Sequence, residues 1–251
     1  MRHVKVFVVT QDEPVYAPVY VDAIIAACRH EFVGVTALPA GGTKGFLALV
    51  RQRLRMYGTV DFIRAGLLFA RAKVSRSVAK VAARHGVPTV AAVNVNDPAF
   101  VAKIRELGVD VLVSVAANQR FLPDLLAAPR VAAVNLHSAL LPKYRGIDGL
   151  FWALAHGETT VGVTAHLMTA GFDEGAILGQ TPFGVPPEAT LHDLYREAIR
   201  RGSALLAQVL DDLATGRAAA HPNEAAAESY FSWPTPEAVR EFRRRGRRFF
   251  G

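Results

Sequence analysis

The stretch VDVLVSVAANQRFLPDLLAAPRVAAVNLHSALLPKYRG, residues 109–146, decides the fold class. It contains two mainly apolar runs, residues 109–116 and 131–136, and both are rich in valine or alanine. Such runs are typical of strands that are buried on both faces of a parallel sheet. Open parallel sheets bind ligands beyond the carboxyl ends of their strands. The polar residues that follow these two runs are therefore the first candidates for a functional site.

Strand and helix patterns alternate through most of the remaining chain. Further predicted strands are 4–9, 32–38, 87–93, 161–168 and 177–185, and predicted helices are 15–29, 75–85, 98–107 (with Asp97 as its cap) and 190–213. Only a loop separates the strands 161–168 and 177–185, so we expect these two to pair antiparallel. The alternation predicts an α/β fold, with a Rossmann-like, mostly parallel sheet and helices on both faces.

The composition excludes several classes of protein. The chain has 251 residues, of which 51% are hydrophobic and 20% charged, so an intrinsically disordered protein is excluded. No apolar run approaches the roughly 20 residues that a membrane-spanning helix needs. The amino end lacks the pattern of a secretory signal, and the single Cys28 cannot form an intramolecular disulfide. These features lead us to expect a cytoplasmic protein.

The formal net charge of +7 is concentrated in two segments. Residues 43–73 hold seven basic residues and one acid, and residues 240–251 hold six arginines and one acid. The rest of the chain is mildly acidic. Basic surfaces of this kind attract phosphates, nucleic acid or acidic lipid, although arginines also serve simply to solvate exposed helix faces.

The same two segments fall outside the strand–helix alternation. Residues 43–73 are predicted to form a helical insertion after the second strand, as two amphipathic helices broken near Gly58. We expect this insertion to pack on the domain or on a second subunit of a homodimer, with membrane-surface binding as the less favoured alternative. Residues 1–215 are predicted as one catalytic domain, and 216–251 as a tail packed on it, with residues 230–236 extended and 236–250 a basic helix.

Three polar residues form the candidate site. The run 131–136 ends as Asn135-Leu136-His137, and residues two apart on a strand point the same way. An amide and an imidazole can together donate hydrogen bonds to an oxygen that gains negative charge. Asp173, between Gly171 and Gly175, could sustain the charge on His137 or relay a proton. Taken singly, these residues also fit capping and turn roles, and a metal set of His137, His166 and Asp173 lacks a short ligand spacing.

The motifs taken together resemble a known family. VNLHSALLPKYRG (134–146), ALAHGETTVGVTAHLM (153–168) and GFDEGAILGQ (171–180) are similar to the formyltransferases that use 10-formyltetrahydrofolate. That family includes the glycinamide ribonucleotide, methionyl-tRNA and amino-sugar N-formyltransferases. Its pattern of Asn-x-His, LLPxYRG, GxT and Asp-x-Gly is met in order and spacing.

The resemblance implies the formyltransferase fold and a catalytic trio of Asn135, His137 and Asp173. A substrate amine would attack the formyl carbon of 10-formyltetrahydrofolate and release tetrahydrofolate, while protonated His137 and Asn135 stabilise the oxyanion. The residues implied for folate binding are Ala117, Asn118, Gln119, Arg120, Phe121, Leu122, Thr169, Ala170, Gly171 and Phe172. Those expected on the acceptor side are Gln11, Asp12, Tyr144 and Arg145. No metal is expected.

The acceptor amine is less well specified. Ala139 stands where the family usually has serine, and Asp148-Gly149 replaces a common small-residue–proline pair. The segment VVTQDEPVYAPVY after the first strand lacks the glycines of a phosphate loop, which disfavours glycinamide ribonucleotide. We therefore expect a small amine, such as a nucleotide-linked amino sugar or an amino-acid type metabolite. Methionyl-tRNA formylation, with tRNA as partner, and 10-formyltetrahydrofolate hydrolysis remain alternatives, as does a catalytically silent protein that binds RNA or a membrane surface.

Overall fold

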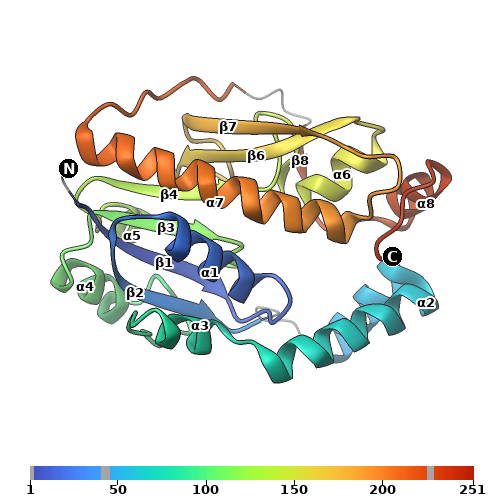
Figure 1. Cartoon of the computed structure of the whole chain (residues 1–251), viewed down its shortest axis with the longest axis horizontal. Coiled ribbons are helices and arrows are strands. Elements are labelled where there is room, and N and C mark those ends of the chain that lie inside the picture. The colour runs from blue at the N-terminus through green and yellow to red at the C-terminus, as the bar shows by residue number, and fades with distance from the viewer. Residues whose placement is uncertain (1–2, 41–45, 225–228) are drawn as a thin grey trace.

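The computed structural model contains a six-stranded sheet with helices on both faces (Figure 1), and it describes residues 3–40, 46–224 and 229–251. The strands are β1 (Lys5–Gln11), β2 (Glu31–Leu38), β3 (Val111–Val115), β4 (Ala132–His137), β6 (Thr160–Leu167) and β7 (Ile177–Gly184), in the order β2-β1-β3-β4-β6-β7. The first four run parallel, β6 is antiparallel to β4, and β7 is antiparallel to β6. The predicted Rossmann-like, mostly parallel sheet is confirmed.

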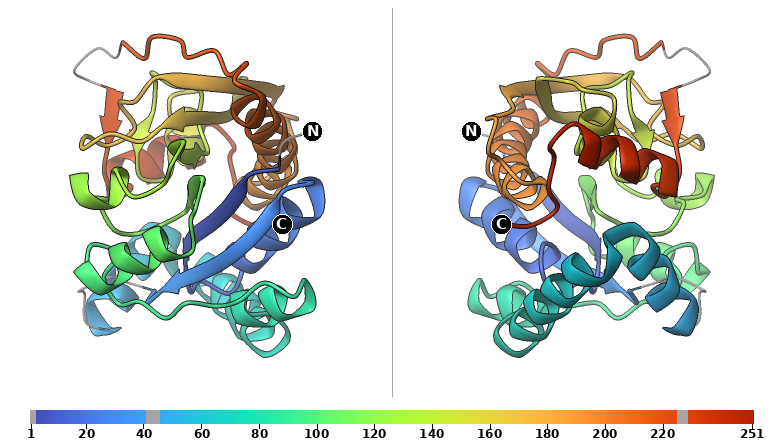
Figure 2. Two further views of the ribbon diagram at one scale, coloured as in Figure 1. Left: turned by 90° about the vertical axis from the view of Figure 1, so that its left-hand side faces the viewer. Right: turned by 90° about the vertical axis from the view of Figure 1, so that its right-hand side faces the viewer.

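The helices pack on the sheet through two hydrophobic clusters, one on each face. They are α1 (Ala17–Ala27), α2 (Phe46–Ser75), α3 (Val78–Arg84), α4 (Pro98–Glu106), α5 (Pro123–Leu126), α6 (Gly149–Ala155), α7 (Leu191–Thr215) and α8 (Pro236–Arg244). Buried residues of α1, α3 and α7 belong to one cluster and those of α4 and α5 to the other, which gives the layers seen in Figure 2. Within the described residues, no helix is long and apolar enough to cross a bilayer.

The predicted strand at residues 87–93 is wrong. This segment makes one isolated bridge to β2, where Val35 N donates to Pro88 O and Val90 N donates to Val35 O. Pro88 has no N–H to extend the ladder, and the chain then leaves the sheet edge. Asp97 is the N-cap residue of α4, as predicted, but its side chain accepts from Asn94 Nδ2 (3.1 Å) and not from the first turn of the helix.

The insertion forms α2, in which two helical segments meet at Gly58. Gly58 has φ 69° and ψ 179°, a conformation that favours glycine, so the predicted break is confirmed. Asp61, just after the break, pairs with Arg64 (3.3 Å) and with Arg243 of α8 (3.5 Å). Beyond the break, Ile63 and Leu67 are exposed, so these two side chains do not pack on the domain. The other expected partner of the insertion, a second subunit, stays a prediction.

The tail folds back onto the body of the protein. Its strand β8 (Tyr230–Phe231) pairs in parallel with β5 (Arg145–Gly146), which belongs to the loop after β4. The predicted helix 236–250 ends early, at Arg244, and the chain then turns so that Phe249 is buried. The carbonyls of Arg248 and Phe249 accept from the N–H groups of Leu191 and His192 in the first turn of α7. Helix starts leave such N–H groups without partners inside the helix, and here the tail supplies them.

Candidate active site

Asn135 and His137 lie at the end of β4, in the interior of the sheet. The antiparallel register sets Asn135 opposite His166 and His137 opposite Thr164 on β6. Because alternate residues of a strand share a face, Asn135 and His137 project together, as predicted. His137 and His166 are both buried.

Asp173 reaches both residues of the pair from the loop after β6. Its Oδ1 accepts from Asn135 Nδ2 (3.2 Å), and its Oδ2 lies 3.6 Å from His137 Nδ1. Oδ2 also accepts from the backbone N–H of Gly146 (2.7 Å). Asp173 has a φ of 53°, a left-handed conformation that aspartate tolerates better than most residues. The structure thus brings the three predicted residues together, with a hydrogen bond between Asn135 and Asp173 and a charge contact between Asp173 and His137.

The cluster holds Asp173 as a carboxylate. Burial by itself would raise its pKa, but the charge of His137, a hydrogen bond with His166 and the Gly146 N–H together hold the pKa of Asp173 well below its usual range. A buried carboxylate that stays ionised is a fixed negative charge. It can therefore orient and stabilise a neighbouring cation.

Two acceptors orient the ring of His137. Its Nε2 lies 2.8 Å from the carbonyl oxygen of Tyr144, which can only accept, and its Nδ1 faces the carboxylate of Asp173 at 3.6 Å. The ring of His137 is therefore held between a backbone carbonyl and a carboxylate.

His166 is a member of the cluster that the sequence analysis treated only as a potential metal ligand. Its Nδ1 donates to the Leu167 carbonyl (2.8 Å), and its Nε2 lies 3.1 Å from Asn135 Nδ2 and 3.4 Å from Asp173 Oδ1. His166 therefore fixes the Asn135 amide with its NH₂ toward Asp173. The missing signal was the pairing of β4 with β6, which places a histidine directly opposite Asn135. Among the residues described, no group of three or more His, Cys, Asp or Glu side chains has an arrangement that could hold a metal ion.

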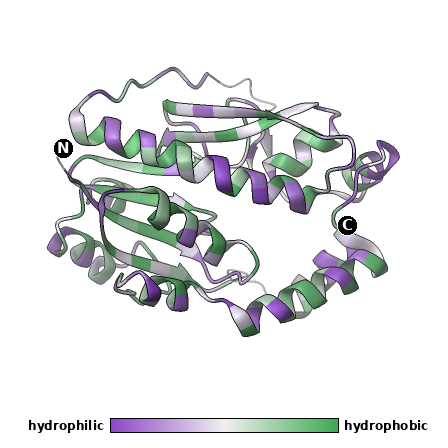
Figure 3. Ribbon diagram, viewed as in Figure 1, coloured by the Kyte–Doolittle hydropathy of each residue, from purple (hydrophilic) through white to green (hydrophobic). Residues whose placement is uncertain are grey.

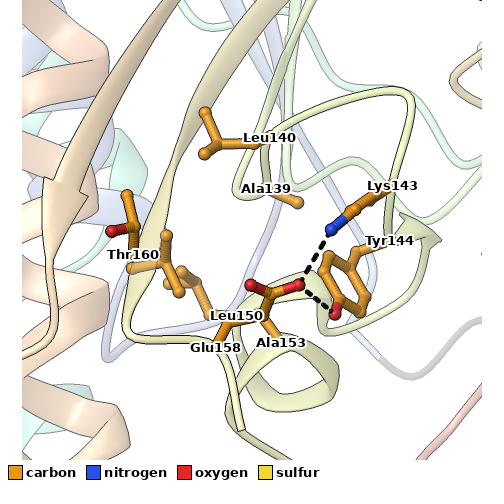
Figure 4. A pocket seen from close by; sticks show the side chains of 9 residues that line it. Ala139, Leu140, Lys143, Tyr144, Leu150, Ala153, Glu158 and Thr160 are labelled. Atoms are coloured by element: carbon orange, nitrogen blue, oxygen red, sulfur yellow. Dashed lines mark hydrogen bonds and ion pairs between the residues drawn. The ribbon is translucent and has the colours of Figure 1, made fainter. Parts of the chain in front are cut away.

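The loop after β4 is fixed by side chains of the two antiparallel strands. Thr164 Oγ1 donates to Ala139 O (2.6 Å) and accepts from Leu141 N (3.2 Å), and Gln180 Nε2 donates to Leu141 O (2.7 Å). Beneath the loop is a small pocket in which Glu158 accepts hydrogen bonds from Lys143 and Tyr144 (Figure 4). These bonds hold the loop backbone that carries the Tyr144 carbonyl against His137.

The two loops predicted to bind folate lie next to each other. Arg120 Nε donates to the Ala170 carbonyl (2.5 Å), and the Arg120 guanidinium lies over the ring of Phe172 at 5.5 Å. Phe172 and Leu122 are both exposed although they are apolar. Phe121 points instead into the hydrophobic core, and the side chains of Asn118 and Gln119 are bonded to Pro39 O (2.8 Å) and Val95 N (2.9 Å).

The residues predicted for the acceptor side are more scattered. The Tyr144 hydroxyl donates to Glu158 (2.9 Å), so its ring belongs to the small pocket and only its carbonyl meets His137. Arg145 binds Glu174 (3.0 Å) and Ser229 Oγ (3.0 Å). Within the part of the chain that the structure describes, no hydrogen bond or ion pair joins Gln11 or Asp12 to the trio.

A comparison with family models matches residues 65–210, more than half of the chain, to the family described as formyl transferase. The chain belongs to the formyl transferase family. The match runs from within α2 to within α7, and so includes the strands and loops that carry Asn135, His137, His166 and Asp173.

Relatives with curated names add detail to this membership. The formyl transferase is 37% identical over 151 residues to the methionyl-tRNA formyltransferase of Synechococcus sp. (strain JA-3-3Ab), which is 60% of this chain and 47% of that protein. It is also 37% identical over 140 residues to that of Trichlorobacter lovleyi, covering 56% of this chain and 44% of the relative. The matched region spans about half the length of these relatives.

Solved structures share the fold at low sequence identity. Glycinamide ribonucleotide transformylase 1 of Symbiobacterium toebii superimposes with a TM-score of 0.62 at 18% identity, over 91% of this chain and 92% of that chain. An N-formyltransferase of Helicobacter canadensis, in complex with folinic acid and dTDP-3-aminofucose, superimposes with a TM-score of 0.62 at 16% identity. That superposition covers 97% of this chain and 80% of that chain. At these identities the likeness shows the formyltransferase fold, as expected from the sequence.

This formyl transferase departs from the sequence pattern of its family at Ala139 and at Asp148, and the structure shows what surrounds each residue. At Ala139 the missing serine hydroxyl is not needed to hold the loop, because Thr164 and Gln180 bind its backbone. Asp148 is half-buried, and its Oδ1 accepts from the hydroxyl of Tyr195 (3.1 Å). Desolvation raises the pKa of Asp148 above its usual range, and among the described residues its Oδ2 has no hydrogen-bond partner.

Proposed function

We propose that this formyl transferase transfers a formyl group from 10-formyltetrahydrofolate to a primary amine of a small acceptor, either a nucleotide-linked amino sugar or an amino-acid type metabolite. The observation that carries the proposal is the cluster of Asn135, His137 and ionised Asp173, held at a strand end in a member of this family. The folate donor supplies an activated formyl carbon. The remaining steps are assigned to residues of this chain.

Asn135 and His137 are the groups that stabilise developing negative charge on an oxygen at the site. Fixed donors aimed at such an oxygen are the largest single contribution in many acyl transfers. In the structure His137 Nε2 donates to the Tyr144 carbonyl, so the reacting oxygen has to take the place of that carbonyl. The ionised carboxylate of Asp173 faces His137, and we assign to it the relay, through water, of the proton that the attacking amine loses and the leaving folate nitrogen gains.

The predicted donor loops fit a flat, partly apolar heterocycle. Exposed Phe172 and Leu122 offer apolar contact, and Arg120 holds the two loops together through Ala170 and the Phe172 ring. Loop backbone groups between these side chains would supply hydrogen bonds to the heterocycle's polar edge. In support, the Helicobacter canadensis neighbour is described in complex with folinic acid.

The first experiment follows tetrahydrofolate release by absorbance, with no acceptor and then with separate pools of nucleotide amino sugars, amino acids and methionyl-tRNA. We expect release with one small-amine pool, and its loss in both His137→Ala and Asp173→Asn. Asp211→Asn on α7 makes the same chemical change away from the cluster and should keep full activity. Absence of release in every pool, without detectable folate binding, would contradict the proposal and favour a silent RNA- or membrane-binding protein.

Methionyl-tRNA is the second candidate acceptor, because both relatives described above are methionyl-tRNA formyltransferases. The basic α2 gives this candidate an electrostatic basis, since nucleic-acid affinity rests largely on contacts with phosphates. Formylation of methionyl-tRNA but of no small amine would establish it. Release of tetrahydrofolate without any acceptor would indicate a hydrolase instead.

A further inference from the structure

The second segment of α2, residues 59–75, carries a row of exposed apolar side chains that the proposed chemistry does not use. Val60, Ile63, Leu67 and Val74 are exposed by 62%, 62%, 63% and 80%, and Ala70 between them is exposed too. Their spacing of three, four, three and four residues places all five on one face of the helix. We call these five residues the outer stripe.

The opposite face of this segment is apolar as well. Phe62, Ala65, Leu68 and Ala72 are half-buried there. A helix that is apolar on both sides is normally covered on both sides, and contiguous exposed apolar patches mark interaction surfaces. Figure 3 shows hydrophobic residues recurring along α2, which lies at the edge of the molecule. The outer stripe is therefore a candidate interaction surface.

Charge distinguishes between the candidate occupants. Exposed Arg64 and Arg71 border the stripe on one side and exposed Lys73 on the other. Asp61 is the only acid in residues 59–75, and it is already paired with Arg64 and Arg243. Arg71 and Lys73 form no ion pair with any acid in the described part of the chain. The exposed face is thus apolar with cationic borders.

A second copy of the chain matches this face poorly. An antiparallel pairing of two outer stripes would set Arg64 of one copy near Arg71 of the other, and a parallel pairing would leave the cations without partners. The stripe and its borders contain no carboxylate that could receive a partner's arginine or lysine. Like charges at such positions disfavour the helix pair.

An anionic bilayer surface matches both parts of the face. Aliphatic side chains enter the boundary between headgroups and acyl chains, while lysine and arginine at the borders reach lipid phosphates. We propose that residues 59–75 dock this protein, reversibly, on the surface of an anionic lipid bilayer. The proposal does not depend on formyl transfer.

Flotation with vesicles tests the proposal. One set of vesicles is phosphatidylcholine alone, and the other contains equal parts of phosphatidylcholine and phosphatidylglycerol. We expect the protein to float with the anionic set only, and Ile63→Glu/Leu67→Glu to lower its partition coefficient at least about 10-fold. The matched control is Ala204→Glu/Gln208→Glu, which places the same charges at the same spacing on exposed positions of α7 and should retain binding. Arg71→Gln/Lys73→Gln should weaken binding and reduce its dependence on salt.

Three results would overturn the proposal. The first is that the unaltered protein does not float with anionic vesicles. The second is that the α7 control loses binding as fully as the α2 variant, which would assign the effect to net charge. The third is a dimer, detected by light scattering, that Ile63→Glu/Leu67→Glu dissociates while vesicles are ignored, which would assign the stripe to a second copy. Thermal melting of each variant shows that it is folded, which is expected because the substituted side chains are exposed.

Discussion

Asp173 connects every part of the candidate site, because its two oxygens meet Asn135, His137, His166 and the backbone of Gly146. The contacts with His137, His166 and the Gly146 N–H lower the pKa of its carboxyl group. A group whose pKa is lower in the folded than in the unfolded state stabilises the fold above its unfolded pKa. That stabilisation is lost as the pH falls through the folded value.

Asp173→Asn should therefore change both activity and acid stability. We expect kcat/KM to fall at least about 100-fold, because an amide cannot sustain the charge on His137. The free energy of unfolding should drop less between about pH 7 and about pH 3 in the variant than in the unaltered protein. Urea unfolding at both pH values measures this difference. An unchanged pH dependence would show that Asp173 is not held as a carboxylate.

His166 is expected to act through Asn135 rather than on the reactants. In His166→Ala the Asn135 amide loses the partner that fixes its orientation, so we expect kcat to fall roughly 10- to 100-fold with KM little changed. His166→Asn, which can still accept from Asn135, should recover part of the loss. An equal loss in the two variants would indicate a purely structural role for the residue.

At the scale of helices and strands, a predicted strand was confirmed where its apolar run also lies inside the sheet. The runs 109–116 and 131–136 became β3 and β4 because both are buried on both faces. The run 87–93 has a similar composition, but it lies beyond the edge strand β2, and Pro88 ends its pairing. His166 and the β5–β8 pair were missed for a related reason. Their roles depend on which distant strands become neighbours, and a single sequence does not encode that locally.

The pairing of β5 with β8 gives a prediction at this scale. A Cβ on Gly146 would lie 2.2 Å from the carbonyl oxygen of Phe231, and Gly146 has a φ of 92°. Gly146→Ala should therefore displace β8 and move the Gly146 N–H away from Asp173, with activity falling more steeply than stability. Initial rates and thermal melting of the same preparation test this. Gly184→Ala, where a Cβ meets nothing within 4 Å, is the control and should match the unaltered protein.

At the scale of the whole molecule, aromatic rings join parts of the chain that are distant in sequence. The ring centroid of Phe242 in α8 lies 5.1 Å from that of Phe151 in α6 and 4.7 Å from that of Phe249. The ring centroid of Phe249 lies 5.1 Å from that of Tyr57 in α2. Phe151, Phe242 and Phe249 are fully buried. The tail is thus part of the main core, although the sequence suggested only that it packs on the domain.

Phe242→Ala should lower the free energy of unfolding by about 3–5 kcal/mol, the cost usual for emptying a buried phenylalanine site. Arg244→Ala on the exposed side of α8 should change it by only about 0.5 kcal/mol or less. Urea unfolding of both variants measures these changes in the free energy of unfolding. A loss below about 1 kcal/mol for Phe242→Ala would mean that α8 contributes little to the core.

The contact between the tail and the start of α7 has a practical consequence for work with this protein. The carbonyls of Arg248 and Phe249 complete the first turn of α7, and Gly251 follows only two residues later. A bulky insertion beside Phe249 would therefore disturb a helix start and the aromatic core together.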